Sequence, residues 1–117
     1  MNKLFKKNKW TQVIVHVNNN NGWADNFQNS FSPQLDQYEL HNDLVYIRLH
    51  GTNGQYIGLY SDKFLENIIN WIKSKAVKNS LIYFNNTDSV SSGNLADALS
   101  NATLLSSKLS YLNLYAD

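Results

Sequence analysis

The chain has 117 residues, a formal net charge of +1, no cysteine and one proline. This length fits one domain, and the lack of cysteine excludes disulfide scaffolds, thiolate metal sites and a cysteine nucleophile. The balanced charge argues against nucleic-acid binding, and no apolar run is long enough to span a membrane. Because residues 1–7 lack the apolar stretch of a secretory signal, we expect a soluble, cytoplasmic protein.

Lysines crowd the start of the chain, and we interpret residues 1–10 as a basic N-terminal tail before a single domain over residues 11–117. A solvated terminus is the simplest explanation of such a tail. Contact with phosphate or with an acidic membrane is the alternative.

The first predicted strand covers residues 11–17, which are rich in β-branched side chains, and a run of asparagines ends it. Residues 22–41 show no clear period, so we predict a long irregular loop with room for one helical turn. Loops of this length are uncommon in compact domains and are often functional.

The second predicted strand, residues 43–51, shows the clearest pattern. Side chains alternate along a strand, so each of its two faces can be read from the sequence. One face carries Val45, Ile47 and Leu49, and the other carries Tyr46, Arg48 and His50. The first face is aliphatic, whereas the second holds a guanidinium and an imidazole.

A helix is predicted from Asp62, with Ser61 as its N-cap. A short strand over residues 80–84 and a last helix follow it. Both helices show apolar residues at helical spacing. In the first these are Phe64, Leu65, Ile68, Ile69 and Ile72, and in the last Leu95, Ala98, Leu99, Ala102, Leu105 and Leu109. The order of elements predicts an α/β fold with about three parallel strands and two amphipathic helices.

Polar residues follow all three predicted strands at their carboxyl ends, where parallel α/β folds bind ligands. They are His16, Arg48, His50, Asn85 and Asn86. An unpaired Arg48 is too costly to bury, so we expect it to meet an anionic ligand or an internal acid. His50 fits either proton transfer or a structural role, and the asparagines fit either ligand orientation or capping of the next loop.

Several classes of site are excluded by the sequence. It contains no zinc-protease, nucleophile-elbow, dinucleotide or P-loop motif, and no third ligand completes a metal site with the two strand-end histidines. We therefore predict no metal and no cofactor. Asp43 begins its strand and lies at the wrong end, while Asp88 and Asp97 are expected to be surface acids.

The second half of the chain contains an ordered set of motifs: Tyr46-x-Arg48-x-His50-Gly51, Gly54-x-Tyr56-x-Gly58-x-Tyr60-Ser61, Leu65 and Trp71, and Tyr83-Phe84-Asn85-Asn86. Through these motifs, residues 43–105 resemble the domain-of-unknown-function family 72, proteins of TIM-barrel type. Thr52 departs from the basic or proline residue that members often have, and the segment after residue 86 matches loosely. The resemblance implies the C-terminal portion of a (β/α) barrel with a polar mouth formed by Arg48, His50, Tyr60, Asn85 and Asn86.

Since a (β/α)₈ barrel needs about 250 residues, the resemblance implies a partial barrel whose missing strands lie elsewhere. Three hypotheses follow. In the first, the chain is a C-terminal fragment without a complete active site. In the second, it assembles with itself or with a second chain and then binds a small anionic or sugar-like ligand as an enzyme. Its catalytic residues would be Arg48 and His50, and its ligand contacts Tyr60, Asn85 and Asn86. The third is a non-catalytic module whose sheet edge or aromatic loop meets a partner.

Overall fold

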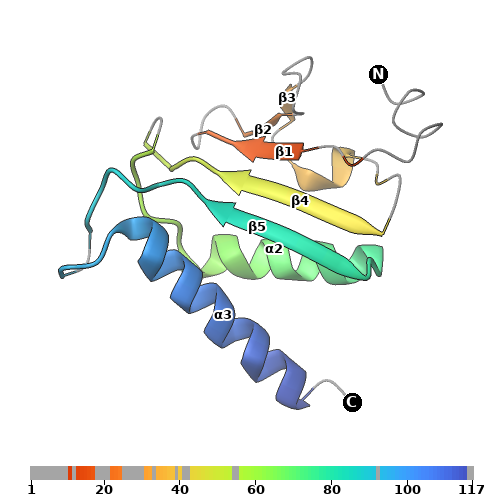
Figure 1. Ribbon diagram of the computed structural model, residues 1–117. Coiled ribbons are helices and arrows are strands. Elements are labelled where there is room, and N and C mark those ends of the chain that lie inside the picture. The colour runs from red at the N-terminus through yellow and green to blue at the C-terminus, as the bar shows by residue number, and fades with distance from the viewer. Residues whose placement is uncertain are drawn as a thin grey trace.

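The computed structural model describes residues 11, 13–17, 22–24, 31–32, 34–38, 40, 43–53, 56–91 and 93–115. Within them lie one sheet, two α-helices and one 3-10 turn (Figure 1). The strands are β1 (Val13–His16), β2 (Trp23–Ala24), β3 (Phe31–Ser32), β4 (Leu44–Leu49) and β5 (Asn79–Phe84); the helical elements are η1 (Leu35–Gln37), α2 (Asp62–Lys75) and α3 (Asp97–Tyr115). The predicted basic tail lies outside the described residues.

The three strands predicted from the sequence form the parallel part of the sheet. The strand order is β3-β2-β1-β4-β5, and β4 pairs in parallel with β1 on one side and with β5 on the other. The register sets Val15 beside Arg48 and Arg48 beside Tyr83. All three parallel strands therefore end at the same edge of the sheet, as the sequence predicts.

The prediction of an irregular loop over residues 22–41 is wrong in part. This segment contains β2 and β3, which extend the sheet in antiparallel fashion beyond β1, and η1 follows them. Each of the two strands is only two residues long, so neither can show the alternation on which a strand prediction depends. Over the residues that the structure describes, the sheet thus holds five strands, of which three are parallel, and it is open rather than closed into a barrel.

The two faces of the sheet differ in what covers them. Both helices pack on the face that carries Ile14, Ile47 and Leu49, which are at most 1% exposed and belong to the hydrophobic core. The opposite face, which we name the open face, is half-buried or exposed. Its side chains are Val13, Val15, Tyr46, Arg48, Leu81 and Tyr83.

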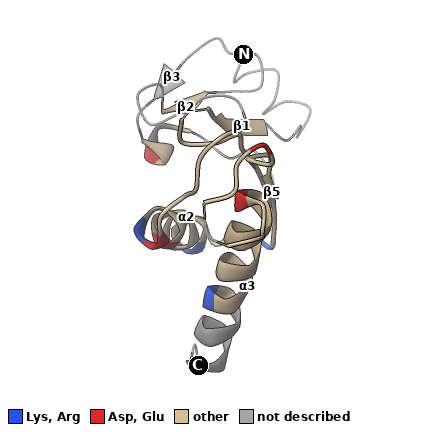
Figure 2. Ribbon diagram, turned by 90° about the vertical axis from the view of Figure 1, so that its left-hand side faces the viewer, with Lys and Arg blue, Asp and Glu red and all other residues tan. Residues whose placement is uncertain are grey.

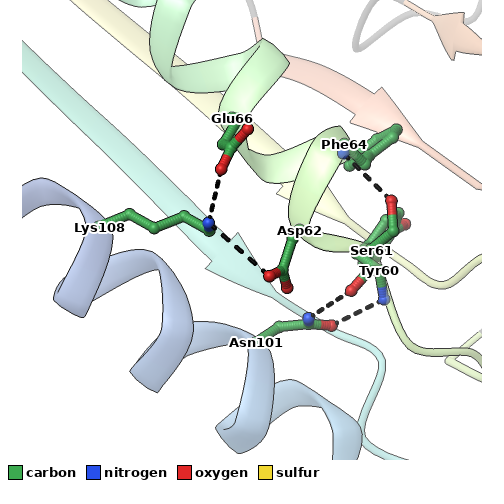
Figure 3. Close-up of polar contacts among 7 residues, drawn as sticks. All are labelled: Tyr60, Ser61, Asp62, Phe64, Glu66, Asn101 and Lys108. Carbon is green, nitrogen blue, oxygen red and sulfur yellow. Dashed lines mark hydrogen bonds and ion pairs between the residues drawn. The ribbon is translucent and has the colours of Figure 1, made fainter.

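Local sequence explains where α2 begins and ends. The Ser61 side chain accepts a hydrogen bond from the Phe64 N–H, as the predicted N-cap should, and Ala76 ends the helix with a left-handed backbone. Lys108 of α3 binds Glu66 at 2.8 Å and lies 3.9 Å from Asp62, which ties the two helices together (Figure 3). Neither helix, among the described residues, is apolar and long enough to cross a membrane.

The apolar stripe predicted for the last helix is only half covered. Ala98 and Leu105 are buried, whereas Leu95, Leu99 and Leu109 are 48%, 53% and 40% exposed. Polar residues take part of the buried face instead, since Asp97 and Asn101 are almost fully buried. The description of Asp97 as a surface acid is therefore wrong.

Candidate functional site

Polar side chains gather at the carboxyl edge of the open face. The Nε of Arg48 donates a hydrogen bond to Oδ1 of Asn85 at 3.3 Å, and the Asn85 N–H bonds to the carbonyl of Leu49. His50 follows β4 by one residue, and its N–H bonds to the carbonyl of His16 at the end of β1. The predicted convergence of the strand ends is therefore present for Arg48, His50 and Asn85, which we name the rim residues.

Arg48 is the exceptional group in this set, because it is a half-buried charge. Within the part of the chain that the structure describes, the salt bridges are made by Lys78 and Lys108, and none involves Arg48. Its neighbours in register are Val15 and Tyr83, and neither carries a charge. Of the two partners expected for Arg48, an internal acid is thus not found among these residues, and Asn85 neutralises none of its charge.

His50 is held as a neutral side chain at pH 7. Burial lowers the pKa of its imidazole, and the positive charge of Arg48 lowers it further. The ring stacks on Tyr56 with centroids 5.6 Å apart, while its Nε2 is buried without a hydrogen-bond partner among the described residues. A neutral imidazole can donate one hydrogen bond and accept one.

Tyr60 lies on the other side of the sheet from the rim residues and is 1% exposed. Its hydroxyl accepts a hydrogen bond from the Gly51 N–H at 2.8 Å and lies 2.9 Å from Nδ1 of His16. The Tyr60 oxygen accepts from the Gly51 N–H, and the Tyr60 O–H can therefore donate its own proton to a neutral His16. Burial raises the pKa of Tyr60, against the effect of the Gly51 N–H, so the phenol keeps this proton.

His16 sits among aromatic rings, with Trp23, Tyr60 and Phe64 at centroid distances of 5.0, 5.3 and 4.9 Å. Burial lowers the pKa of His16 to about 4, so the ring is neutral near pH 7 and its Nδ1 can accept from Tyr60. This contact joins the end of β1 to Tyr60, two residues before α2 begins. It also fixes Gly51, the neighbour of His50.

Asn86 is 0% exposed and bonds to the protein itself. Its Nδ2 donates to the Gly58 carbonyl at 2.8 Å and to Oδ1 of Asn101 at 3.0 Å. Asn101 also bonds to both the N–H and the carbonyl of Tyr60, at 3.0 and 2.9 Å (Figure 3). The described geometry gives Asn86 and Tyr60 internal partners, whereas Asn85 reaches the open face.

Asp97 organises the loop between β5 and α3. Its carboxylate accepts hydrogen bonds from the Ser89 hydroxyl and from the hydroxyl and N–H of Ser91. Burial acts to raise the pKa of Asp97, but these hydrogen bonds outweigh burial and hold the pKa below its usual value. The Ser89 hydroxyl in turn accepts from the Gly58 N–H, so Asp97 indirectly fixes the loop that follows β4.

The loop after β4 folds back on itself in a shape that requires glycine. Gly51 and Gly58 have φ angles of +125° and +117°. A Cβ on Gly51 would overlap the backbone oxygen of Ile57, and one on Gly58 would overlap Thr52. Both positions therefore require glycine, and Gly51 lies directly after His50.

The sequence did not identify Asn101 or Asp97 as parts of this framework. Both lie in an apolar helical pattern, and the only sign of their role is that a polar residue interrupts the covered face of α3. Among the described residues, no three of His, Asp and Glu lie close enough together to hold a metal ion.

A sequence model of the family described as protein of unknown function DUF72 matches residues 1–112. The chain belongs to this family. The match is wider than the resemblance found in residues 43–105, because it includes the segment before β4. Neither the curated proteins nor the solved structures yielded a match to the chain. Membership in DUF72 supplies no reaction, so the function has to be argued from the rim residues.

Proposed function

We propose that this DUF72 chain binds a small oxyanion, a phosphate or carboxylate group, through Arg48 at the carboxyl edge of the open face. The observation that carries the proposal is the half-buried guanidinium, which has no acidic partner among the described residues. Desolvating an unpaired charge is costly, so an anion that pairs with Arg48 would be stabilised there. The planar guanidinium can also donate two parallel hydrogen bonds to one oxyanion.

The other rim residues suit the same ligand. Asn85 accepts from Nε of Arg48, which orients the guanidinium and leaves its terminal nitrogens available to a ligand. His50 is neutral and offers a hydrogen bond rather than a second charge. In this proposal Tyr60 and Asn86 do not contact the ligand. They hydrogen-bond to the backbone of Gly51 and Gly58 and so support the loop that carries His50. Catalytic roles for Arg48 and His50 stay predictions.

We also propose that one chain carries only part of the site. The sheet is open, and Leu81 and Tyr83 beside the rim residues are 41% and 50% exposed. Parallel strands are almost always covered on both faces, so we expect further strands or a second chain to cover the open face. This supports the hypothesis of a partial (β/α) barrel, a fragment in which Arg48 already binds the anion and to which further strands would add the remaining ligand contacts.

The test is a titration of the purified chain with inorganic phosphate and with citrate, followed by calorimetry. We expect Arg48→Gln to weaken binding at least about tenfold, because it removes a charge-assisted hydrogen bond. Lys73→Gln is the matched control, since it removes one positive charge from the last turn of α2 and should leave the affinity unchanged. Equal affinities for the parent and Arg48→Gln, or no binding by the parent, would refute the proposal.

A further inference from the structure

One of the two edge strands of the described sheet is β5. Hydrogen bonds run from the Asn79 N–H to Asp43 and from the Asn85 N–H to Leu49, at 3.0 and 2.8 Å. Backbone groups alternate in direction along a strand, so the odd-numbered residues of β5 face β4. The N–H groups of Ser80, Ile82 and Phe84 therefore point outward, away from the sheet.

This edge has none of the features that usually prevent strands from pairing with another chain. Natural edge strands carry lysine or proline, or they are bulged or very short. β5 has six residues, all of which pair in regular register with β4, and its sequence NSLIYF contains no charge and no proline. Its edge is thus a complete template for one more strand.

The exposed surface of α3 continues this uncharged edge. Figure 2 shows that α3 carries almost no charged residues. Those in its sequence are Asp97, which is 0% exposed, and Lys108, whose side chain is 18% exposed and pairs with Asp62 and Glu66 of α2. The outer surface of a helix that faces water is normally charged. Among the described side chains of α3, the large exposed ones are Leu99 and Leu109 instead, and Leu95, which is 48% exposed, lies two residues before the helix begins.

Both uncharged features point away from the rest of the chain. Leu99 lies nine residues before Lys108, which at 100° per residue places it about half a turn round the helix. Lys108 faces Asp62 and Glu66 of α2, so Leu99 faces away from α2. The outward N–H groups of β5 likewise face away from β4, and the Ala98 N–H joins α3 to Asn86 at the end of β5.

We infer that a second copy of this chain docks on this surface, which we name the β5–α3 edge: β5 together with Leu95, Leu99 and Leu109. A two-fold axis perpendicular to the sheet sets β5 antiparallel to β5 of the second copy. Because both helices lie on one face of the sheet, the same axis sets α3 against α3. The two sheets then become one continuous sheet of twice the width.

Two properties of the β5–α3 edge favour an identical partner. In a two-fold interface each patch meets its own copy, so a charged patch repels itself and an uncharged apolar patch does not. The second property is the strand edge itself: in an antiparallel pair, the outward N–H and carbonyl groups of β5 meet the same groups of the second copy. The inference concerns the edge alone and stands whether or not Arg48 binds an anion.

Sedimentation equilibrium of the purified chain tests this. We expect a dimer, and we expect Ser80→Pro and Leu99→Glu each to raise the dimer dissociation constant at least about tenfold. The N–H of Ser80 points outward, so proline removes a bond to the second copy and none to β4. Leu99 is 53% exposed, so glutamate there should leave the fold of one chain intact, which circular dichroism verifies.

Leu59→Glu is the matched control, because Leu59 is 38% exposed in the loop before α2 and lies outside the β5–α3 edge. It should dimerise as the parent does. A parent chain that stays monomeric at its highest soluble concentration overturns the inference. A folded Ser80→Pro or Leu99→Glu variant that dimerises like the parent also overturns it, as does a monomeric Leu59→Glu.

Discussion

At the scale of single residues, the candidate site depends on polar groups that never reach the open face. Asn101 is the clearest example, since one side chain satisfies the N–H and the carbonyl of Tyr60 and the amide of Asn86. Buried polar groups that lose their partners cost about 1–3 kcal/mol each. The framework beneath the rim residues should therefore be stable as a set and sensitive to any single loss.

We predict that Asn101→Ala lowers the free energy of unfolding by about 2 kcal/mol or more, because the buried N–H and carbonyl of Tyr60 lose their partner and the Asn86 amide keeps only its bond to Gly58. Ser107→Ala, at an exposed position of the same helix, should change it by less than about 0.5 kcal/mol. Urea denaturation followed by circular dichroism measures both variants. Equal midpoints for the two would mean that the Asn101 contacts contribute nothing to stability.

At the scale of elements, the loop between β4 and α2 is the part whose shape is most constrained. Its backbone turns sharply at Gly51, with φ of +125°, and passes directly over the backbone of Ile57. Non-glycine residues at such φ angles carry strain of about 1–3 kcal/mol, and here steric overlap is added. Position 51, next to His50, therefore requires glycine.

Gly51→Ala should destabilise the fold by more than about 2 kcal/mol, whereas Gly93→Ala should cost about 1 kcal/mol. Gly93 has a φ of +68°, but no heavy atom lies within 4 Å of the place that an added methyl group would take, so it isolates backbone strain from overlap. Thermal unfolding of the two variants and the parent is the measurement. A Gly51→Ala variant as stable as Gly93→Ala would show that the loop can move aside.

The elements differ in how well the sequence predicts them, for physical reasons. β1, β4, β5 and the N-cap of α2 were all predicted within about two residues, because alternation and capping are local signals. β2 and β3 were missed because two residues cannot show a period. For α3, the stripe was recognised but not its orientation, which is set by the polar contacts of Asp97, Asn101 and Lys108.

The candidate site shows the same division. Parallel strands end together, so the meeting of Arg48 with Asn85 could be predicted from strand order alone. The sequence could not separate Asn85 from Asn86, because adjacent residues at a strand end point to opposite faces and only the packing tells which face is covered. Asn86 is consequently in the covered layer and Asn85 on the open face.

At the scale of the whole molecule, buried histidine makes the fold depend on pH. His16 has a pKa of about 4 in the folded chain, against 6.5 in an exposed state. The unfolded chain therefore binds more protons between these two values, and stability falls as the pH falls. This contribution is fully present above pH 6.5 and is lost as the pH drops toward 4. Burial and Arg48 lower the pKa of His50 as well, so His50 acts in the same direction.

We predict that the free energy of unfolding decreases by about 3 kcal/mol from His16 alone as the pH falls from 7 to 4. His16→Asn should remove most of this dependence, because its side-chain oxygen can accept from Tyr60 in place of Nδ1 but does not titrate. Urea midpoints at several pH values, for the parent, His16→Asn and His50→Asn, separate the two histidines. The hydrogen bonds of Asp97 lower its pKa, so the contribution of Asp97 to stability is lost only at still lower pH. If the stability of the parent and of His16→Asn depended on pH in the same way between pH 7 and 4, the role given to His16 would be contradicted.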